Sequence, residues 1–295
     1  MISILIPVFN YNVVPLVYAV NEQIKNLQHP YEIIVLDDHS TNLNMESANS
    51  KIGTIPQVTY LKAPRNKGRS ATRHALAQAA TSEWLLFLDA DVMPSSPQFI
   101  KKYLENHKKA SIVYGGITYT SQSPKDHILR YKYGREREAQ PVAQRLKNPY
   151  ISIISQGFLI NKNLFLKVNP YKENRYGLDV LFTHNLKKEA ASVLHIDNPV
   201  VHEGLETGQK FIEKSEKAVQ SLLFLTENGQ IPEDHYRIQK VALRLRKWKL
   251  SGLFTKSLAI FKKKMVKNLL SKNPSLFIFD VYRLHKFLEK QKPHA

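Results

Sequence analysis

Two aspartates, Asp89 and Asp91, follow the apolar run WLLFL with a single alanine between them. In an extended segment, side chains two residues apart point to the same side, so both carboxylates can face one point at the end of a strand. Mg²⁺ and Mn²⁺ prefer oxygen ligands and usually keep coordination positions for water and substrate phosphates. The spacing therefore favours a Mg²⁺ or Mn²⁺ site, although an acidic loop after a buried strand would contain the same residues.

A second acidic pair, Asp37 and Asp38, follows the apolar run YEIIVL. Carboxylates in this position could accept hydrogen bonds from a nucleobase N–H group or a ribose hydroxyl. An Asp-rich turn or helix cap is the alternative. Arg73 and the basic run at residues 65–69 come next, and cations at a helix N-terminus can bind a diphosphate. Taken one at a time, each of these cations could equally belong to a basic surface exposed to water.

Two later residues are further candidates for chemistry. Asp179 lies near the start of a predicted helix, where it could be a general base or only a capping carboxylate. His202 follows a predicted strand, and a neutral imidazole can bind a metal ion or lie beside a diphosphate. A surface histidine is the simpler alternative.

The elements that must position these residues follow a repeating pattern up to about residue 115. Apolar runs predict strands at residues 2–8, 31–36, 58–61, 84–88 and 111–114. Helices are predicted from an Asn12 cap to about residue 27, over residues 68–80, and from Ser96 with Pro97 as the first helical residue. Uniformly apolar runs are typical of parallel strands covered on both faces, and such sheets bind ligands beyond the carboxyl ends of their strands. Five candidate residues fall there: Asn10, Asp37, Asp38, Asp89 and Asp91.

The second half of the chain is less regular. The polar segment at residues 118–149 is predicted to be a functional loop or helix over a cleft. Regular structure is expected again at residues 151–160, in a short helix at NKNLFLKV, in a helix over residues 177–189 and in a strand at SVLHI. After about Phe211 the sequence predicts basic helices. We therefore expect a catalytic domain over residues 1–210, with halves 1–115 and 116–210, and a helical basic extension over residues 211–295.

Composition limits the class of protein. The 295 residues contain no cysteine, which excludes disulfides and thiolate sites. The 43 Lys and Arg exceed the 25 Asp and Glu, for a net charge of +18, and from Lys240 to the C-terminus 15 residues are basic and 2 acidic. This tail favours an anionic partner, either phospholipid headgroups or nucleic acid. Residues 253–270 could lie on anionic lipid or could pack on the catalytic domain with their lysines in water.

The N-terminal run resembles a first strand more than a signal peptide, because it is short, lacks a basic leader and contains Pro7. No apolar segment approaches the roughly 20 residues that cross a bilayer. We expect a location in the cytoplasm or on the cytoplasmic face of the membrane.

Taken in order, the segments ISILIPVFN, YEIIVLDDHST, RNKGRSATRHALAQA, WLLFLDADV, YGLDVLFTHNLKK and PVVHEGLE resemble a family 2 glycosyltransferase of the GT-A fold. The resemblance covers residues 1–206. It implies an α/β fold with a mostly parallel central sheet flanked by helices, a Rossmann-like nucleotide half, a divalent metal and an inverting transfer from a nucleotide-sugar. A UDP-sugar is the favoured donor, and a saccharide or lipid-linked saccharide of cell-surface polysaccharide or glycolipid assembly is the expected acceptor.

The resemblance also assigns residues. It implies Asp179 as the catalytic base, Asp91, His202 and Asp89 at the metal, and a nucleotide site that contains Pro7, Phe9, Asn10, Asp37, Asp38, Lys67, Gly68, Arg69, Arg73 and Asp89. One position departs from the family, because the glutamate that usually precedes the base is Leu178 here. We interpret this change as altered acceptor recognition. The segment from Ser155 to Phe158 matches the usual acceptor motif only loosely.

Two rival functions predict other behaviour. A nucleic-acid-binding protein would show strongly salt-dependent affinity and would need no carboxylates at strand ends. A nucleotidyltransferase would also use carboxylates and Mg²⁺ but would release pyrophosphate. Neither accounts for Asp179 and His202, so sugar transfer is favoured and nucleic acid is not the expected partner.

Overall fold

The computed structural model describes residues 1–122, 125–170 and 174–291, and the chain divides into two compact units. The first unit comprises Met1–Thr120, Arg137–Asn174 and Phe182–Gly204, and the second comprises Ser121–Glu136, Arg175–Leu181 and Leu205–Ala295. The predicted division at residue 210 lies close to the start of the last segment. A single boundary nevertheless does not describe this chain, because two short internal segments also belong to the second unit.

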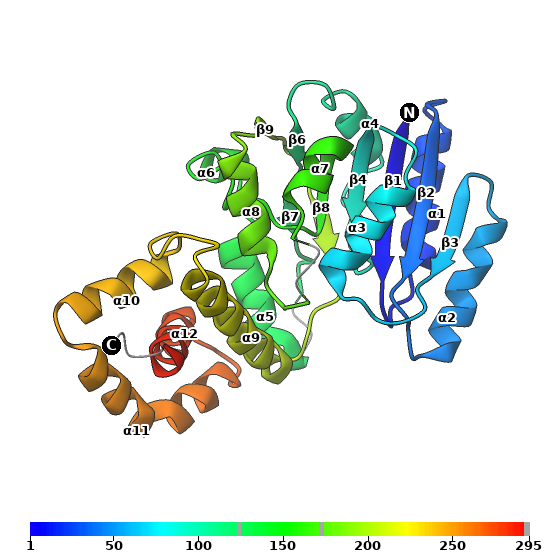
Figure 1. Cartoon of the computed structure of the whole chain (residues 1–295). Coiled ribbons are helices and arrows are strands. Elements are labelled where there is room, and N and C mark those ends of the chain that lie inside the picture. The colour runs from blue at the N-terminus through cyan, green and yellow to red at the C-terminus, as the bar shows by residue number, and fades with distance from the viewer. Residues whose placement is uncertain (123–124, 171–173, 292–295) are drawn as a thin grey trace. The chain divides into compact units, whose positions relative to one another are not determined.

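A seven-stranded sheet forms the centre of the first unit (Figure 1). Across the sheet the strands are β3 (Val58–Lys62), β2 (Tyr31–Asp37), β1 (Ile2–Val8), β4 (Trp84–Leu88), β8 (Gly157–Asn161), β6 (Ile112–Tyr114) and β9 (Val193–His195). β1 to β4 are parallel, β8 is antiparallel to β4 and β6, and β6 is parallel to β9. The predicted mostly parallel sheet is therefore confirmed.

Helices cover the sheet, and their apolar sides supply the core. The helices of this unit are α1 (Val14–Lys25), α2 (Leu43–Ser50), α3 (Arg69–Ala79), α4 (Phe99–Leu104), α6 (Val142–Arg145) and α7 (Lys162–Val168), with a 3₁₀ turn η1 (Lys51–Thr54). α8 (Asp179–Lys188) begins in the second unit and continues in the first. Leu76 of α3 and Phe165 of α7 pack with the sheet residues Leu5 and Phe87 in one buried cluster. Burial on both faces explains why the central strands β1 and β4 are mostly apolar.

Two predicted helix starts are wrong. α1 begins at Val14 after the N-cap residue Val13, although the Asn12 side chain does accept a hydrogen bond from the Val14 N–H at 3.1 Å. α4 begins at Phe99, so Pro97 lies in the preceding turn and is not the first helical residue. In both cases the polar or Pro residue initiates a turn that leads into the helix, which the sequence pattern alone does not separate from a cap.

A second, three-stranded sheet was not expected from the sequence. It has the order β5 (Val92–Pro94), β10 (Val200–His202) and β7 (Ile117–Thr118). In the antiparallel pair of β10 and β5, His202 lies opposite Val92, the residue after Asp91. This register brings two residues that are 111 positions apart to the same end of one small sheet.

The second unit is helical in the part of the chain that the structure describes. Its elements are η2 (Lys125–His127), α5 (Ile128–Tyr133), α9 (Gly208–Glu227), α10 (Arg237–Lys247), α11 (Ser251–Leu269) and α12 (Leu276–Lys290), and a π-helical turn, Gly134–Glu138, begins in this unit and ends in the first. α12 packs against α5, α9, α10 and α11 (Figure 1). The helical basic extension is thus present, and the polar segment predicted over residues 118–149 contains β7, η2, α5, the π-helical turn and α6 in its described residues.

α12 buries a histidine without hydrogen bonds. His285 is 1% exposed, and neither of its ring nitrogens has a hydrogen-bond partner in the described structure. Burial lowers the pKa of His285 from its ordinary value of 6.5, and Lys286 and Lys262 lower it further while Glu289 opposes them. The folded chain therefore keeps His285 neutral where the unfolded chain would bind a proton.

We expect the free energy of unfolding to fall as the pH falls below 6.5, because the unfolded chain gains a proton at His285 that the folded chain excludes. Replacement by leucine removes two unpaired nitrogens, so His285→Leu should increase stability by about 1 kcal/mol and make this pH dependence shallower. Calorimetric unfolding of both proteins from about pH 5 to pH 8 measures both effects. Equal pH dependence in the two proteins would show that His285 does not contribute.

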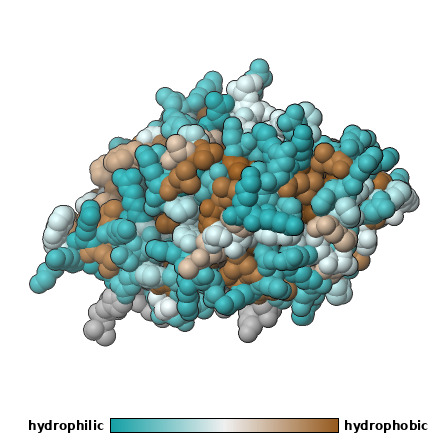
Figure 2. Space-filling view, turned by 90° about the horizontal axis from the view of Figure 1, so that it is seen from above, coloured by the Kyte–Doolittle hydropathy of each residue, from teal (hydrophilic) through white to brown (hydrophobic). Residues whose placement is uncertain are grey.

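Surface hydrophobicity is distributed unevenly. On the face shown in Figure 2, hydrophobic residues emerge in small groups between hydrophilic side chains. The exposed large apolar residues include Phe9 in the first unit and Trp248, Leu253 and Ile260 in the second. Within the described ranges, no helix combines the length and apolar character that crossing a membrane requires.

Candidate active site

The parallel strands β1, β2 and β4 end at the same edge of the large sheet, and most of the predicted site residues follow them. Asn10, after β1, has φ of 51° and connects this loop to the loop after β2. Its side-chain oxygen accepts hydrogen bonds from the N–H groups of Thr41 at 2.8 Å and Asn42 at 2.9 Å. Asn10 therefore shapes the edge, and its own contact with a nucleotide stays a prediction.

The acidic pair after β2 holds the surrounding loops. Asp37 is fully buried and accepts hydrogen bonds from the Ser40 N–H at 2.6 Å and the Tyr60 hydroxyl at 2.7 Å. Burial and the bond to Asp37 raise the pKa of Tyr60, so its hydroxyl stays protonated as the donor. Asp38 accepts hydrogen bonds from the N–H groups of Lys67 and Gly68, each at 2.8 Å. Asp38 thus fixes the basic loop that leads into α3, whereas Asp37 fixes the turn after β2 and links it to β3.

Arg73 on α3 is the best-anchored cation at this edge. It is 4% exposed, and its Nη2 donates to Asp89 Oδ1 at 2.5 Å and to the Ser155 carbonyl at 2.8 Å. Arg69 Nη2 lies 3.7 Å from the other oxygen of Asp89. Lys67, Arg69 and Phe9 are exposed at the same edge, and Pro7 is half-buried. The Ser155 segment therefore supports the Arg73–Asp89 pair through its backbone.

Asp91 and His202 form the second pair of the site. His202 Nε2 lies 3.3 Å from Asp91 Oδ2, and His202 is 4% exposed. Burial would raise the pKa of Asp91, but His202 and Arg69 outweigh it and hold this pKa below its ordinary value. Asp91 is therefore a carboxylate, which is the form that binds a cation.

The side chains at this edge fit a divalent cation that is also coordinated by a bound substrate. Asp89 Oδ2 and Asp91 Oδ1 are buried atoms with no hydrogen-bond partner in the described structure, so each keeps lone pairs available. Among the described residues no group of three or more His, Asp or Glu side chains could hold a metal ion. Asp91 and His202 therefore offer only part of the ligands that a cation needs. Phosphate oxygens and water would supply the rest, as they usually do at Mg²⁺ sites that bind substrate phosphates. Asp89 is engaged mainly with arginines.

Sequence reasoning missed three residues beside Asp91. The Glu203 N–H donates to the Asp91 carbonyl at 2.9 Å, and a Cβ on Gly204 would lie 2.4 Å from the Asp91 Cβ, so no larger residue fits there. Tyr11 and Glu203 line a hollow of about 270 Å³ beside Ala90. Burial, with the charges of Asp91 and Glu203, raises the pKa of Tyr11. The segment HEG after the predicted strand contains Glu203 and Gly204, and Tyr11 follows the first predicted strand, but the sequence gave no sign that they lie near Asp91.

Asp179 lies in the second unit as the first residue of α8, and it is half-buried. Leu178 beside it is 4% exposed and packs with Leu181, Val219 and Leu222. A glutamate at position 178 would place a charge in this apolar cluster, so the departure at Leu178 has a packing reason in this chain. The role of Asp179 as a base stays a prediction.

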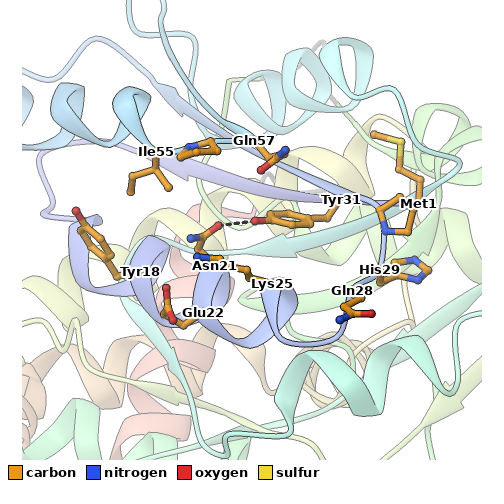
Figure 3. Close-up of a pocket in the computed structure, with 12 residues that line it drawn as sticks. Met1, Tyr18, Asn21, Glu22, Lys25, Gln28, His29, Tyr31, Ile55 and Gln57 are labelled. Atoms are coloured by element: carbon orange, nitrogen blue, oxygen red, sulfur yellow. Dashed lines mark hydrogen bonds between the residues drawn. The ribbon is translucent and has the colours of Figure 1, made fainter.

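A larger cavity, of about 620 Å³, lies away from these carboxylates (Figure 3). It is lined by residues that precede β1 and β2, among them Met1 and His29, and by α1 residues. Inside it the Tyr31 hydroxyl donates to Asn21 Oδ1 at 2.8 Å. Because open α/β sheets bind their ligands beyond the carboxyl ends of the strands, this cavity at the amino end is not the candidate active site.

Comparison with known proteins gives a family and a fold. The model of "Glycosyl transferase family 2" matches residues 3–167, which is more than half of the chain. An uncharacterized glycosyltransferase of Haemophilus influenzae is 29% identical over 113 residues, a match to 36% of this chain and 44% of that protein. A second curated relative, from Bacillus subtilis, is matched over 34% of its length, so the chain spans less than half of either relative.

Solved structures share the fold at low identity. The mannosyltransferase PcManGT of Pyrobaculum calidifontis, in complex with GDP-Man and Mn²⁺, has a TM-score of 0.58 and 14% identity, over 98% of this chain and 86% of that one. The glucosyl-3-phosphoglycerate synthase of Mycobacterium tuberculosis, in complex with Mg²⁺ and UDP, has a TM-score of 0.52 and 16% identity, over 79% of this chain and 81% of that one. At these identities the likeness establishes the fold alone.

Proposed function

Because this chain belongs to glycosyl transferase family 2, we propose that it transfers a sugar from a nucleotide diphosphate donor to an acceptor hydroxyl with inversion at the anomeric carbon. The donor is a UDP-sugar, and the acceptor is a saccharide or a lipid-linked saccharide. The observation that best supports this function is the Asp91 carboxylate, which has one buried oxygen without a hydrogen-bond partner and the other facing His202.

The donor occupies the carboxyl edge of β1, β2 and β4. Phe9, exposed after β1, offers a flat apolar surface for the base, and the Asp38 loop with Lys67 and Gly68 borders the ribose. Arg69 and Arg73 extend from the first turns of α3 toward Asp89, where they provide positive charge for the diphosphate. The loops that hold these residues are braced by Asn10 and Asp37, so the site is preorganised by hydrogen bonds.

Asp91 and His202 are the residues that would hold Mg²⁺ or Mn²⁺, with Asp89 beside them. Bound there, the cation would supply charge that stabilises the departing diphosphate. Asp179 takes the proton from the acceptor hydroxyl as it attacks, and Arg69 and Arg73 oppose the negative charge that develops on the leaving group.

A donor screen tests this function directly. UDP-sugars and GDP-sugars are compared for hydrolysis with Mn²⁺, and nucleoside diphosphate is measured as the product. Release of UDP supports sugar transfer, whereas release of pyrophosphate would indicate a nucleotidyltransferase. Thermal stabilisation by UDP with Mn²⁺ gives an independent measure of donor binding, because a bound ligand raises apparent stability.

We expect removal of divalent metal with EDTA to lower donor hydrolysis at least about 100-fold, because Arg69 and Arg73 would then be left to oppose the charge of the diphosphate beside two carboxylates. Adding Mn²⁺ or Mg²⁺ in excess should restore the rate. The melting temperature of the nucleotide-free protein serves as the control. If EDTA leaves it unchanged, the loss of activity is not caused by unfolding. Full activity in EDTA would contradict the assignment of Asp91 and His202.

A further inference from the structure

The outer part of the second unit carries charge of one sign. Between residues 236 and 279 the sequence contains 12 Lys and Arg and no Asp or Glu. On α10, Arg237, Lys240, Arg244 and Lys247 are all exposed, and their spacing of three or four residues places them on one side of the helix. Its exposed cations therefore favour an anionic partner.

α11 exposes apolar residues among its lysines. Its inner side contains the buried residues Met265 and Leu269, whereas Leu253 and Ile260 are 67% and 78% exposed. Leu253 and Ile260 are seven residues apart, so they lie on one face of the helix. Lys256, Lys263 and Lys264 are exposed around them, at three or four residues from Ile260. The face thus combines side chains that gain free energy by leaving water with cations that stay at a charged surface.

The turn between α10 and α11 continues this pattern. Trp248 is 65% exposed and Leu250 is 42% exposed, with exposed Lys249 between them. The turn is held by backbone hydrogen bonds of 2.8 Å from Lys249 to Arg246 and from Leu250 to Leu245, and Lys249 has φ of 58°. A hydrogen-bonded turn fixes the outward placement of Trp248 and Leu250, so their exposure is a property of the fold.

We propose that the outer face of α11, together with the turn at Trp248, binds the surface of a bilayer that contains anionic phospholipid. Lys, Trp and Leu on one helical face are the composition of interfacial helices, in which the apolar side chains enter the headgroup and acyl boundary. Contacts to nucleic-acid phosphates need cations only, and they give no reason for exposed Leu253 and Ile260. The apolar residues therefore favour a bilayer over RNA or DNA.

Vesicle co-sedimentation of the whole chain tests the proposal. Binding is expected to vesicles of phosphatidylcholine with about one third phosphatidylglycerol, and to be much weaker with phosphatidylcholine alone. Leu253→Ser with Ile260→Ser should weaken binding at least about tenfold, because two apolar anchors are lost. The matched control is Leu146→Ser with Ile151→Ser, two exposed apolar residues of the first unit, which should bind like the wild type. Donor hydrolysis by both double variants should equal that of the wild type.

Tryptophan fluorescence distinguishes insertion of apolar side chains into the bilayer from electrostatic attraction to its surface. The chain has two tryptophans, and Trp84 lies in β4, so a Trp84→Phe variant leaves Trp248 as the reporter. Anionic vesicles should shift its emission to the blue, and brominated acyl chains should quench it. Equal binding by the Leu253 and Ile260 double variant, or tighter binding to RNA than to vesicles with no blue shift, would overturn the proposal.

Discussion

Replacement of Asp91 by alanine is expected to reduce donor turnover at least about 100-fold. It should also abolish the additional thermal stabilisation that Mn²⁺ gives to the protein in the presence of UDP. Asp91 has one buried oxygen without a hydrogen-bond partner in the described structure, and its other oxygen faces His202 at 3.3 Å. Alanine removes both oxygens, so of the two residues that would hold the cation only His202 remains, with Asp89 beside it. Melting curves with UDP, with Mn²⁺ and with both, beside steady-state hydrolysis, measure the two effects.

The fold should tolerate this change, because the structural contact of Asp91 is made by its backbone. Its carbonyl accepts the N–H groups of Glu203 at 2.9 Å and Gly204 at 3.3 Å, and alanine retains that carbonyl. Asp197→Ala is the matched control, since Asp197 is an exposed carboxylate of the same unit. If Asp91→Ala kept full metal-dependent affinity for UDP, Asp91 would not be a metal ligand.

The sequence was sufficient to predict the parallel half of the large sheet, because its central strands β1 and β4 are almost wholly buried and mostly apolar. β1 and β4 have the predicted bounds, and the apolar runs at Tyr31 and Val58 became β2 and β3. The edge at which the site residues gather follows from the parallel order of these strands. Apolar runs and strand order thus carry most of the information on where the carboxylates lie.

The small sheet could not be predicted, because its strands are two or three residues long and such strands show no periodicity. Its pairing depends on contacts between residues about a hundred positions apart, and these contacts bring His202 to Asp91. For the same reason, the sequence does not predict which charged side chains pair with each other. Nothing in the spacing distinguishes Asp89, whose Oδ1 pairs with Arg73, from Asp91, whose Oδ2 faces His202.

Family resemblance and packing give different information on Leu178. The resemblance marks this position as a missing carboxylate, whereas the structure shows a core residue in contact with α9 residues such as Val219. A hydrophobic side chain there stabilises the second unit by burial. The substitution therefore removes a polar group next to Asp179 and anchors the start of α8, which leaves Asp179 as the carboxylate on which the proposed base chemistry depends.

Asp179→Asn is accordingly expected to lower turnover by about 10²- to 10⁴-fold, the range that general-base catalysis contributes. Asparagine has the size of aspartate and keeps hydrogen-bonding ability at the N-terminus of α8, but it cannot take a proton from the acceptor hydroxyl. The loss of negative charge at the helix start should cost only about 0.3–1 kcal/mol of stability. Steady-state turnover and the melting temperature measure these effects.

Donor binding separates this variant from Asp91→Ala. Stabilisation by UDP with Mn²⁺ should stay at the wild-type level in Asp179→Asn, because Asp179 acts on the acceptor and not on the nucleotide. Asp234→Asn is the matched control, since Asp234 is an exposed aspartate of the same unit. If Asp179→Asn turned over donor at the wild-type rate, another group would have to accept the proton. Glu203, which is exposed and lines the hollow beside Ala90, would then be the next residue to replace.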